Sequence, residues 1–340
     1  MATKIGINGF GRIGRCVVRA LYERGIKDVE IVGINDLTDT RSLAHLLKYD
    51  SIHRGFKAAT VGHTDTGITL NGKDVQVTAL KDPKELPWKS LGADIVLECT
   101  GLFTDKSKAI GHVGAGAKKV IISAPAKDHD LTVVMGVNHD KYDADKHQIL
   151  SNGSCTTNCL APVAQVLLYN FGVERGLMTT IHSYTNDQSL LDLPHRKGDL
   201  RRARAAAVSM IPSTTGAAKA LSEVIPELKG KFDGLAIRVP TIDVSLVDLT
   251  LTTEKPVSVE AINAAMKKAA ESDPLKGFLY YVDEELVSSD FIGHPGSSIF
   301  DSTQTKILGD RFAKVFSWYD NEWGFANRMV DLAQLVSQKL

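Results

Sequence analysis

The sequence has few cysteines, no excess of charge and no long apolar segment. Four cysteines among 340 residues make no disulfide framework, and their spacing matches no common zinc pattern, so we expect no metal site. Forty basic residues balance forty acidic ones, which removes the overall field that attracts nucleic acid or an anionic membrane. No apolar run approaches the roughly 20 residues that span a bilayer, and no signal segment opens the chain. We therefore expect a cytoplasmic protein with no membrane and no nucleic acid partner.

The first half of the chain alternates short apolar runs with helical stretches, a pattern typical of a parallel sheet built from strand–helix–strand units. Helices are expected at 12–24 and from Thr40, whose side chain can cap the second one. Strands are expected at 4–8, 29–35, 94–99, 118–123 and 132–135, with a hairpin turn at Asn71-Gly72. The pattern predicts an α/β fold with a Rossmann-type doubly wound parallel sheet.

The pattern changes after about residue 152. A helix is expected at 155–171, and longer alternating strands follow, notably at 235–239 and 244–253. Strands that follow one another with few intervening helices favour a mixed or antiparallel sheet. The segment 322–338 is amphipathic at helical spacing. The sequence thus predicts a second, α+β catalytic domain.

A glycine-rich turn follows the first strand. Gly9-Phe10-Gly11-Arg12-Ile13-Gly14 is a G-x-G-x-x-G that opens a helix, where free N–H groups favour a pyrophosphate. Asp36 ends the second strand, 22 residues after Gly14, where a carboxylate can bind an adenosine ribose and repel a 2′-phosphate. The alternative is an ordinary tight turn with a surface aspartate. We predict that NAD, rather than NADP, binds here.

Cys155 is a candidate nucleophile. It opens an apolar helix, and a helix N-terminus is expected to lower the pKa of its thiol. His182 ends a strand-like run and is the candidate base, because a strand-end histidine can reach a nucleophile on another element. The alternatives are a buried structural cysteine and a structural histidine. The same packed, inert role is expected for the three remaining cysteines, Cys16, Cys99 and Cys159.

Three segments suit anions. Residues 195–204 are rich in arginine, although a solvated helix start is a common reason for such a run and a nucleic-acid patch is weakly supported. Residues 213–216 place hydroxyl groups just before a helix, a setting that suits phosphate. Arg238 interrupts an apolar strand, where an arginine usually needs an anionic partner. Together these segments suggest a substrate with more than one anionic position.

Several motifs resemble the phosphorylating glyceraldehyde-3-phosphate dehydrogenase family. They are NGFGRIGR at 8–15, SCTTNCLAP at 154–162, HSYTNDQ at 182–188, DLRRARAAA at 199–207, TTGAAKA at 214–220, RVPT at 238–241 and WYDNEWGF at 318–325. The resemblance covers essentially the whole chain. It implies an NAD-binding domain formed by 1–153 and 318–340, a catalytic domain formed by 154–317, and a homotetramer.

The resemblance also implies roles for single residues. Cys155 would be the nucleophile and His182 its general base. Inorganic phosphate would be held by Ser154, Thr156, Thr215 and Gly216, with Arg202 nearby, and the phosphate of glyceraldehyde 3-phosphate by Thr185 and Arg238. The NAD-binding residues would be Gly9, Arg12, Ile13, Asp36, Lys81, Ser123 and Asn321.

Other functions stay open at this point. Residues 291–305 and the segment DNEWGFANRM also resemble erythrose-4-phosphate dehydrogenase, and residues 195–199 make a loop longer than is usual in the family. A non-phosphorylating dehydrogenase would hydrolyse the thioester with water. A redox sensor would need the thiol but not the phosphate sites. The segments at 184–187 and 215–219 favour the glyceraldehyde-3-phosphate enzyme.

Overall fold

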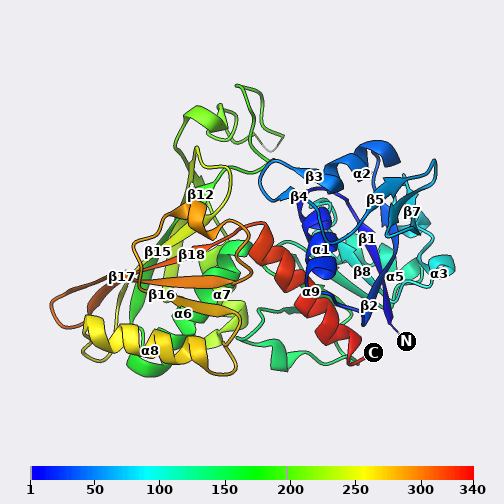
Figure 1. Ribbon diagram of the computed structural model, residues 1–340. Coiled ribbons are helices and arrows are strands. Elements are labelled where there is room, and N and C mark those ends of the chain that lie inside the picture. Colours follow the sequence, from blue (N-terminus) through cyan, green and yellow to red (C-terminus); the bar gives the residue numbers. More distant parts are fainter. Residues whose placement is uncertain (1, 197) are drawn as a thin grey trace. The chain divides into compact units, whose positions relative to one another are not determined.

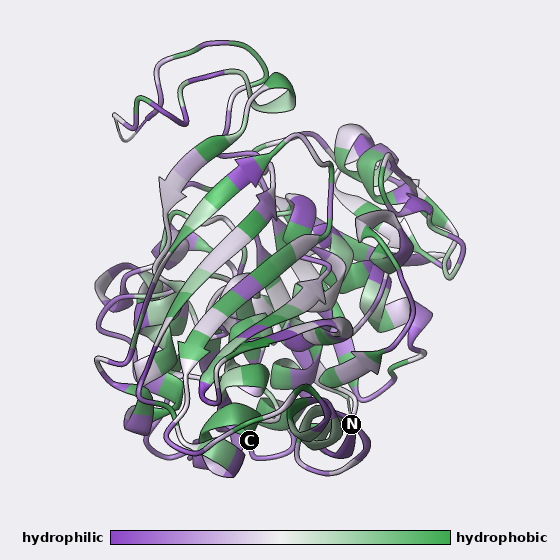
Figure 2. Ribbon diagram, turned by 90° about the vertical axis from the view of Figure 1, so that its left-hand side faces the viewer, coloured by the Kyte–Doolittle hydropathy of each residue, from purple (hydrophilic) through white to green (hydrophobic). Residues whose placement is uncertain are grey.

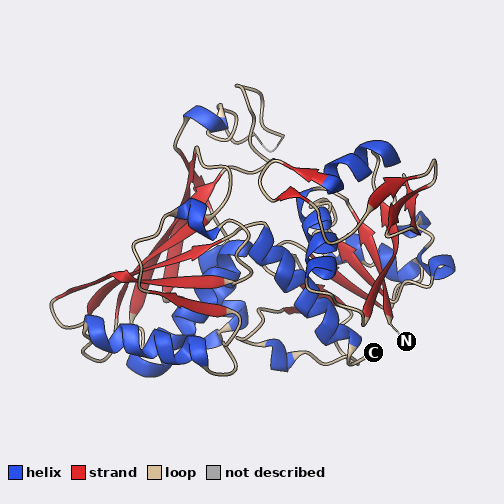
Figure 3. Cartoon of the chain, viewed as in Figure 1, coloured by secondary structure: helices blue, strands red, loops and turns tan. Residues whose placement is uncertain are grey.

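The computed structural model describes residues 2–196 and 198–340, so Lys197 of the basic stretch lies outside the described residues. The chain forms two compact units, each built on one large sheet (Figure 1; Figure 3). The N-terminal unit contains the residues up to Val133 with His139–Ser154 and Phe325–Leu340, and the C-terminal unit contains Val134–Asn138 and Cys155–Gly324. Each unit is described below by itself.

A nine-stranded sheet in the order β10-β11-β9-β8-β1-β2-β7-β6-β5 forms the centre of the N-terminal unit. Neighbours from β10 to β7 pair in parallel, and β6 and β5 extend the sheet as antiparallel strands. The strands are β1 (Thr3–Asn8), β2 (Val29–Asn35), β5 (Val61–His63), β6 (Gly67–Leu70), β7 (Lys73–Thr78), β8 (Ile95–Glu98), β9 (Lys119–Ile122), β10 (Leu131–Thr132) and β11 (Ile149–Ser151). The strand order reverses at β1, between β2 and β8. In such sheets a ligand binds at this point, outside the carboxyl ends of the strands.

Three helices of this unit begin after a small or capping residue, which is Gly11, Asp39 or Asp105. The N-cap of the second helix is Asp39, which accepts a hydrogen bond from Ser42 N (2.8 Å), so the prediction of Thr40 as the cap was wrong by one residue. The helices are α1 (Arg12–Glu23), α2 (Thr40–Lys48), α3 (Trp88–Leu91), α4 (Lys106–Ala109), α5 (Gly111–Gly114) and α9 (Trp323–Ser337), of which α9 enters this unit at Phe325. A short ladder joins β3 (Tyr49–Asp50) to β4 (Arg54–Gly55).

A seven-stranded sheet in the order β13-β14-β12-β15-β18-β17-β16 forms the C-terminal unit. The β12–β14 and β16–β17 pairs are parallel and the other pairs are antiparallel, which confirms the expected mixed sheet. The strands are β12 (Arg175–Ser183), β13 (Ile211–Thr214), β14 (Phe232–Val239), β15 (Ser245–Thr252), β16 (Leu279–Val282), β17 (Ser298–Leu308) and β18 (Phe312–Tyr319). Polar and apolar residues alternate along these strands (Figure 2), so each strand presents two different faces.

One face of this sheet packs against helices α6 (Cys155–Phe171), α7 (Ala217–Val224) and α8 (Val259–Glu271). Their apolar side chains and those of the strands form one buried core, in which Leu160, Leu167 and Phe300 are fully buried. Burying such side chains contributes about 1.5–3 kcal/mol each. Short 3-10 helices complete the chain: η1 (Pro83–Glu85), η2 (His139–Lys141), η3 (Ala206–Val208), η4 (Pro226–Leu228) and η5 (Ser288–Phe291).

Two expected strands are shorter than the sequence suggested. The run at 132–135 pairs only through β10, because the backbone turns at Val134, whose N–H donates to Asn138 Oδ1 (2.8 Å). Cys99 lies just beyond the end of β8 and is half-buried, although the apolar run extends to it. Apolar character marks burial in both cases, and burial does not require a strand.

The start of the C-terminal segment also differs from the expected division of the chain. Residue 318 was the expected boundary, but β18 continues to Tyr319 and pairs along its length with β15 in the C-terminal unit. In the part of the chain that the structure describes, no helix is both long and apolar enough to cross a membrane.

Candidate active site and cofactor pocket

Two glycines of the G-x-G-x-x-G turn lie where a side chain does not fit. Gly9 has φ +92°, and a Cβ there would lie 2.6 Å from Thr100 N. A Cβ on Gly14 would lie 2.4 Å from Gly9 O. The motif therefore lets β1 and α1 approach each other closely, and it leaves open space at Gly11, the N-cap of α1. Gly11 offers no side-chain cap, so the first turn of α1 is suited to an anion.

Asp36 forms a hydrogen bond with the glycine-rich turn and lines a cavity beside it. Its Oδ2 accepts a hydrogen bond from Phe10 N (2.8 Å), and its Oδ1 accepts one from Thr38 N (3.0 Å). A cavity of about 480 Å³ lies at the carboxyl ends of β1, β2 and β8, and its lining includes Gly9, Asp36 and Lys81. The structure thus brings together three residues expected to bind the cofactor. The open glycine turn, the acidic strand end and the cavity between them fit a dinucleotide.

Arg12 and Ile13 occupy the first turn of α1 but do not line that cavity. The Arg12 guanidinium forms an ion pair with the largely buried Asp50, with Nη1 and Oδ2 at 2.5 Å. Burial alone would raise the pKa of Asp50, but the Arg12 hydrogen bond and two backbone N–H groups lower it to about 2. The charge of Arg12 is therefore already compensated within the protein. Ser123 follows β9, and its N–H donates to Glu98 O (3.0 Å).

Cys155 and His182 meet in the C-terminal unit. Cys155 is the first residue of α6 and is half-buried, and its Sγ lies 3.5 Å from His182 Nε2. His182 is 5% exposed and lies near the end of β12. Its Nδ1 lies 2.7 Å from Ser183 O, and a carbonyl can only accept, so Nδ1 carries the proton. Arg238 Nη1 lies farther from Nδ1 (3.3 Å) and is directed to Ser183 O (3.2 Å) and Thr185 Oγ1 (2.8 Å). The lone pair of Nε2 therefore faces the sulfur.

Both groups of this pair favour their neutral forms. Burial first, and then the Arg238 charge, lower the pKa of His182 to about 3. Burial also raises the pKa of the Cys155 thiol, although Arg238 and hydrogen bonds at the start of α6 oppose this shift. The expected lowering of the Cys155 pKa was wrong, because the loss of hydration outweighs the helix N-terminus. The resting pair is a thiol beside a neutral imidazole, ready to pass a proton to Nε2.

A cluster of charged and hydroxyl groups surrounds this pair. Arg238 Nη1 donates to Thr185 Oγ1 (2.8 Å), and Thr185 Oγ1 donates to Asp187. Arg202 Nη1 forms an ion pair with Asp187 Oδ2 (2.6 Å). Although burial would raise the pKa of Asp187, the Thr185 hydrogen bond and the two arginines lower it. The structure thus brings together Thr185, Arg202 and Arg238 around one carboxylate, whose own role was not expected.

The segment before α7 lies beside this cluster. Arg202 Nη2 lies 3.5 Å from Thr214 O, which connects the arginine to the hydroxyl-rich turn. Thr215 Oγ1 accepts from Ala217 N (3.2 Å), and Gly216 is the N-cap of α7. Thr215, Gly216 and Arg202 therefore form a second group of donors suited to an anion.

Tyr319 was missed by sequence reasoning. Its hydroxyl lies 2.8 Å from both Thr156 Oγ1 and Thr180 Oγ1, and its ring contacts the His182 ring edge to face, with centroids 5.9 Å apart. Thr156 is buried, and this tyrosine holds its hydroxyl. The alternation along β18 was the available signal, since it turns Tyr319 toward the core. Ser154 directly precedes Cys155 and is half-buried.

A hydrogen-bonded series links Asn321 to the strand that carries His182. Ser245 Oγ donates to Asn321 Oδ1 (2.7 Å) and accepts from Ser183 N (3.1 Å). Ser183 Oγ donates to the carbonyl of Val244, whose φ is +65°. A β-branched residue at positive φ is strained and persists only where its surroundings fix it. This turn therefore holds Asn321 and β12 in a fixed relation.

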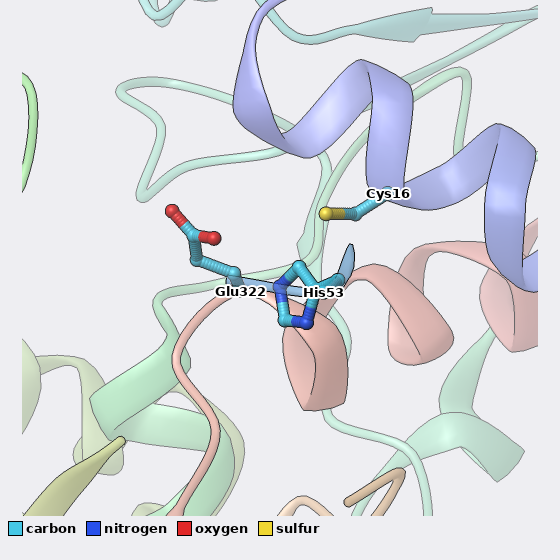
Figure 4. A group of neighbouring side chains, drawn as sticks. All are labelled: Cys16, His53 and Glu322. Atoms are coloured by element: carbon cyan, nitrogen blue, oxygen red, sulfur yellow. The ribbon is translucent and has the colours of Figure 1, made fainter. Parts of the chain in front are cut away.

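The other three cysteines have no comparable setting. Cys16 on α1 is buried, and its sulfur lies within 4.8 Å of a His53 ring nitrogen (Figure 4). Cys159 is fully buried one turn after Cys155, and burial raises its pKa to about 12. Burial likewise raises the pKa of Cys99 to about 12. Cys155 differs from them because its neighbouring histidine, His182, is hydrogen-bonded to a backbone carbonyl and lies beside Arg238.

Comparisons with known proteins cover both units. Residues 3–106 match the family model of the NAD binding domain of glyceraldehyde 3-phosphate dehydrogenase, and residues 154–321 match that of its C-terminal domain. The chain is 58% identical over 337 residues to glyceraldehyde-3-phosphate dehydrogenase 1 of Bacillus cereus, with 99% of each chain covered. It is 57% identical to glyceraldehyde-3-phosphate dehydrogenase of Geobacillus stearothermophilus, with 100% of this chain and 99% of the relative covered. The identity to glyceraldehyde-3-phosphate dehydrogenase of Streptomyces coelicolor is 55%, and both chains are covered in full.

Proposed function

Because the chain belongs to the glyceraldehyde 3-phosphate dehydrogenase family, we propose that its Cys155–His182 pair oxidises D-glyceraldehyde 3-phosphate to 1,3-bisphosphoglycerate with NAD and inorganic phosphate. The chain is an NAD-dependent oxidoreductase of glycolysis and gluconeogenesis. The observation that carries the residue assignment is the 3.5 Å approach of Cys155 Sγ to the unprotonated Nε2 of His182.

The neutral pair supports a cycle in which His182 moves each proton. Cys155 Sγ attacks the aldehyde carbon while its proton passes to Nε2 and on to the carbonyl oxygen, which gives a hemithioacetal. Nε2 then takes the hydroxyl proton as the carbon gives up a hydride, and a thioester remains on Cys155. When bound, NAD supplies the acceptor for that hydride. Phosphate attacks the acyl carbon, the carbon–sulfur bond breaks, and the thiolate recovers its proton from His182.

Two groups of donors near the pair support the phosphate chemistry. Thr185 and Arg238 lie together and would bind the phosphate ester of the substrate. Thr215 and Gly216 with Arg202 would hold the attacking phosphate, together with Ser154 and Thr156. Arginine and hydroxyl donors of this kind bind phosphate oxygens directly. A dehydrogenase that uses water would need only the first of these sites.

The N-terminal unit would hold NAD. Gly9 and Arg12 with Ile13 belong to the turn and first helical residues that would meet the pyrophosphate, and Asp36 would accept hydrogen bonds from the adenosine ribose. Lys81 lines the same cavity and would lie near the adenine. Ser123 and Asn321 would lie near the nicotinamide.

We further propose a homotetramer in the cytoplasm. Leu177, Leu235 and Phe312 are exposed on the strands of the C-terminal sheet, and the register places them on the face opposite to α6. Further leucines are exposed in the segment after His182, at Leu190, Leu191, Leu193 and Leu200. Exposed apolar side chains on this face of the sheet and on the segment after His182 support association with further copies of the chain.

The direct test is NADH absorbance with NAD and glyceraldehyde 3-phosphate, with and without inorganic phosphate, beside erythrose 4-phosphate. We expect steady turnover that requires phosphate and prefers the triose. Turnover independent of phosphate would contradict the second anion site. Preference for erythrose 4-phosphate would keep the roles of Cys155 and His182 and change the substrate. A Cys155→Ser variant that still turns over would overturn the assignment of the nucleophile.

A further inference from the structure

A series of buried polar side chains crosses the N-terminal unit and reaches the cofactor cavity, where Asn8 and Asn35 form part of the lining. Its members are Trp88, His112, Glu98, Asn8 and Asn35, and we refer to them as the buried polar series. Glu98 is 1% exposed and His112 is fully buried. A carboxylate at such depth is rare unless its hydrogen bonds are satisfied. This series has no part in the chemistry proposed for Cys155 and His182.

The donors fix the direction of every hydrogen bond in the series. Trp88 Nε1 can only donate, so its contact with His112 Nδ1 (3.0 Å) makes Nδ1 an acceptor and leaves the proton on Nε2. His112 Nε2 then donates to Glu98 Oε2 (2.9 Å). Asn8 Nδ2 donates to the same oxygen (2.6 Å), so Asn8 turns its carbonyl oxygen the other way. That oxygen accepts from Asn35 Nδ2 (2.8 Å).

The series ends at two loops that line the cofactor cavity. Asn35 donates to Leu80 O (2.9 Å) and accepts from Leu80 N (2.9 Å), so it holds the loop that leads to Lys81. Glu98 Oε1 accepts from Thr100 N (2.8 Å) and from the Thr100 hydroxyl, so it holds the loop after β8. Leu80, Lys81 and Thr100 all line the cavity that contains Asp36.

We propose that Glu98 is a positioning residue for NAD, which fixes both loops of the cofactor cavity through Thr100 on one side and through Asn8 and Asn35 on the other. The inference rests on the proposed placement of NAD in this cavity. Glu98 touches no reacting atom and does not itself line the cavity, but it holds two residues that do, Asn8 and Thr100, and it acts through them.

The position requires a carboxylate rather than an amide. Both oxygens of Glu98 accept two hydrogen bonds, so all four of its partners are donors. A glutamine of the same shape would direct its NH₂ group at two of them. Trp88 prevents His112 from exchanging its tautomer, and a reversal of Asn8 would set its NH₂ against that of Asn35. The two opposed donors must therefore separate, which displaces either the loop at Leu80 or the loop at Thr100.

Glu98→Gln tests the proposal in the full-length protein, with Asp130→Asn as a matched control. Asp130 also lies in the N-terminal unit, where its carboxylate accepts from Gln148 N and Ile149 N (2.8 Å each) and from Lys106, but it does not line the cavity. The dissociation constants of NAD and of ADP-ribose would be measured by titration calorimetry, and KM for each substrate by NADH absorbance. Urea unfolding would report the stability of both variants.

We expect Glu98→Gln to weaken NAD and ADP-ribose by about tenfold each and to raise KM for NAD, with KM for glyceraldehyde 3-phosphate within twofold of the parent. Asp130→Asn should lose stability while its NAD affinity stays within twofold. Unchanged NAD affinity in Glu98→Gln, or an equal loss in Asp130→Asn, would overturn the proposal. If Glu98→Gln does not fold, Thr100→Val removes one of the donors to Glu98 and should weaken NAD severalfold, and unchanged affinity there would also overturn it.

The two proposals fail in different ways. A parent protein that binds NAD but does not oxidise the triose phosphate would contradict the proposed activity and leave the affinity test valid. A parent whose NAD affinity is unchanged by Asp36→Ala would contradict the placement of NAD in this cavity, and with it the role of Glu98.

Discussion

Burial determines the protonation states of two side chains in the candidate active site, His182 and Cys155. His182 stays neutral because it is buried and faces Arg238, and the Cys155 thiol resists ionisation for the same first reason. A neutral imidazole is the form that can accept a proton. The pair therefore differs from a preformed thiolate–imidazolium pair, in which both groups carry charge before the substrate arrives.

The first prediction at this scale concerns the pH dependence of thiol reactivity. The rate of Cys155 alkylation by iodoacetamide should rise with pH and still be rising above pH 8, because burial raises the pKa of this thiol. No step is expected near pH 6–7, since His182 has a pKa of about 3. Mass spectrometry of the Cys155 peptide measures the rate. A plateau reached below pH 7 would contradict the neutral pair.

The control for that measurement is His182→Asn. This variant keeps a polar group of similar size but removes the proton acceptor at Nε2. We expect its alkylation rate near neutral pH to fall by about tenfold or more, which is the low end of the usual contribution of a general base. The rate at high pH, where the thiol ionises without help, should approach that of the parent.

The second prediction concerns cofactor choice at Asp36. Asp36 faces the cavity with its carboxylate, which would repel the 2′-phosphate of NADP. Asp36→Gly should lower the ratio of kcat/KM for NAD to kcat/KM for NADP by about tenfold or more, measured by absorbance of the reduced cofactor. Because Asp36 also holds Phe10 N, the affinity for NAD should fall as well. An unchanged ratio would show that another group discriminates between the cofactors.

At the scale of the element, the connection between β14 and β15 combines strain with a buried acid. Asp243 is buried directly before Val244, the residue with positive φ. Burial raises the pKa of Asp243, and the nearby charges of Asp320 and Glu322 raise it further. The folded protein therefore keeps this carboxyl group protonated over a range of pH in which the unfolded chain ionises it.

The third prediction follows from that shift. A group whose pKa is raised by folding stabilises the fold below its unfolded pKa, and this contribution is lost as pH rises toward the folded pKa. The free energy of unfolding of the parent should fall between pH 5 and pH 9, by up to about 1.4 kcal/mol for each pH unit, because the folded protein holds one proton that the unfolded chain has released. Asp243→Asn removes the ionisation and should make this dependence flatter. Urea unfolding at pH 5, 7 and 9 measures it.

The control for this prediction is Asp233→Asn, which changes an exposed aspartate on the neighbouring strand β14. Its unfolding free energy should keep the pH dependence of the parent. Parallel curves for the parent and for Asp243→Asn would contradict the protonated state of Asp243.

The sequence predicted elements best where local pattern and tertiary packing agree. Helix α6 begins and ends at the predicted residues, because a long apolar run continues through it and is buried in the core of the C-terminal unit. The hairpin turn at Asn71-Gly72 was also right, since both residues adopt positive φ there. The strand at 132–135 was mostly wrong, because burial alone produced its apolar run.

The sequence identified the residues of the site but not their protonation states. The motifs identified Cys155, His182, Thr185 and Arg238, which the fold brings together. No pattern in the sequence reports how completely a group is dehydrated, so the direction of the Cys155 shift was wrong. The ion pair of Arg12 was missed for a related reason, because its partner lies 38 residues away.

At the scale of the whole molecule, strand β12 presents one face to the candidate active site and the other to solvent, where we propose that subunits associate. His182 and Thr180 face the side that carries Tyr319 and α6, while Leu177 points to the opposite, exposed face, where it is 67% exposed. The register places Leu177, Leu235 and Phe312 on that exposed face. A surface of this kind, close to the core of a catalytic unit, is suited to a stable interface between subunits.

The fourth prediction tests that interface. Leu177→Asp places a charge on the exposed face and should convert the proposed tetramer to smaller species, measured by sedimentation velocity at micromolar concentration. Tyr169→Asp is the matched control, because Tyr169 is a similarly exposed apolar side chain on α6. It should sediment like the parent. A Leu177→Asp protein that remains tetrameric would exclude this face from the interface.

The parallel pairing of β12 with β14 has a consequence for how this chain can vary. His182, the proposed base, lies directly opposite Arg238 in the ladder. Side chains alternate between faces, and a shift of one residue in either strand would turn one of the two away from Cys155. A substitution in β12 or β14 therefore changes one face of the sheet only. An insertion or deletion within either strand changes both the face with the candidate active site and the exposed face. We expect length changes to be confined to the connecting loops.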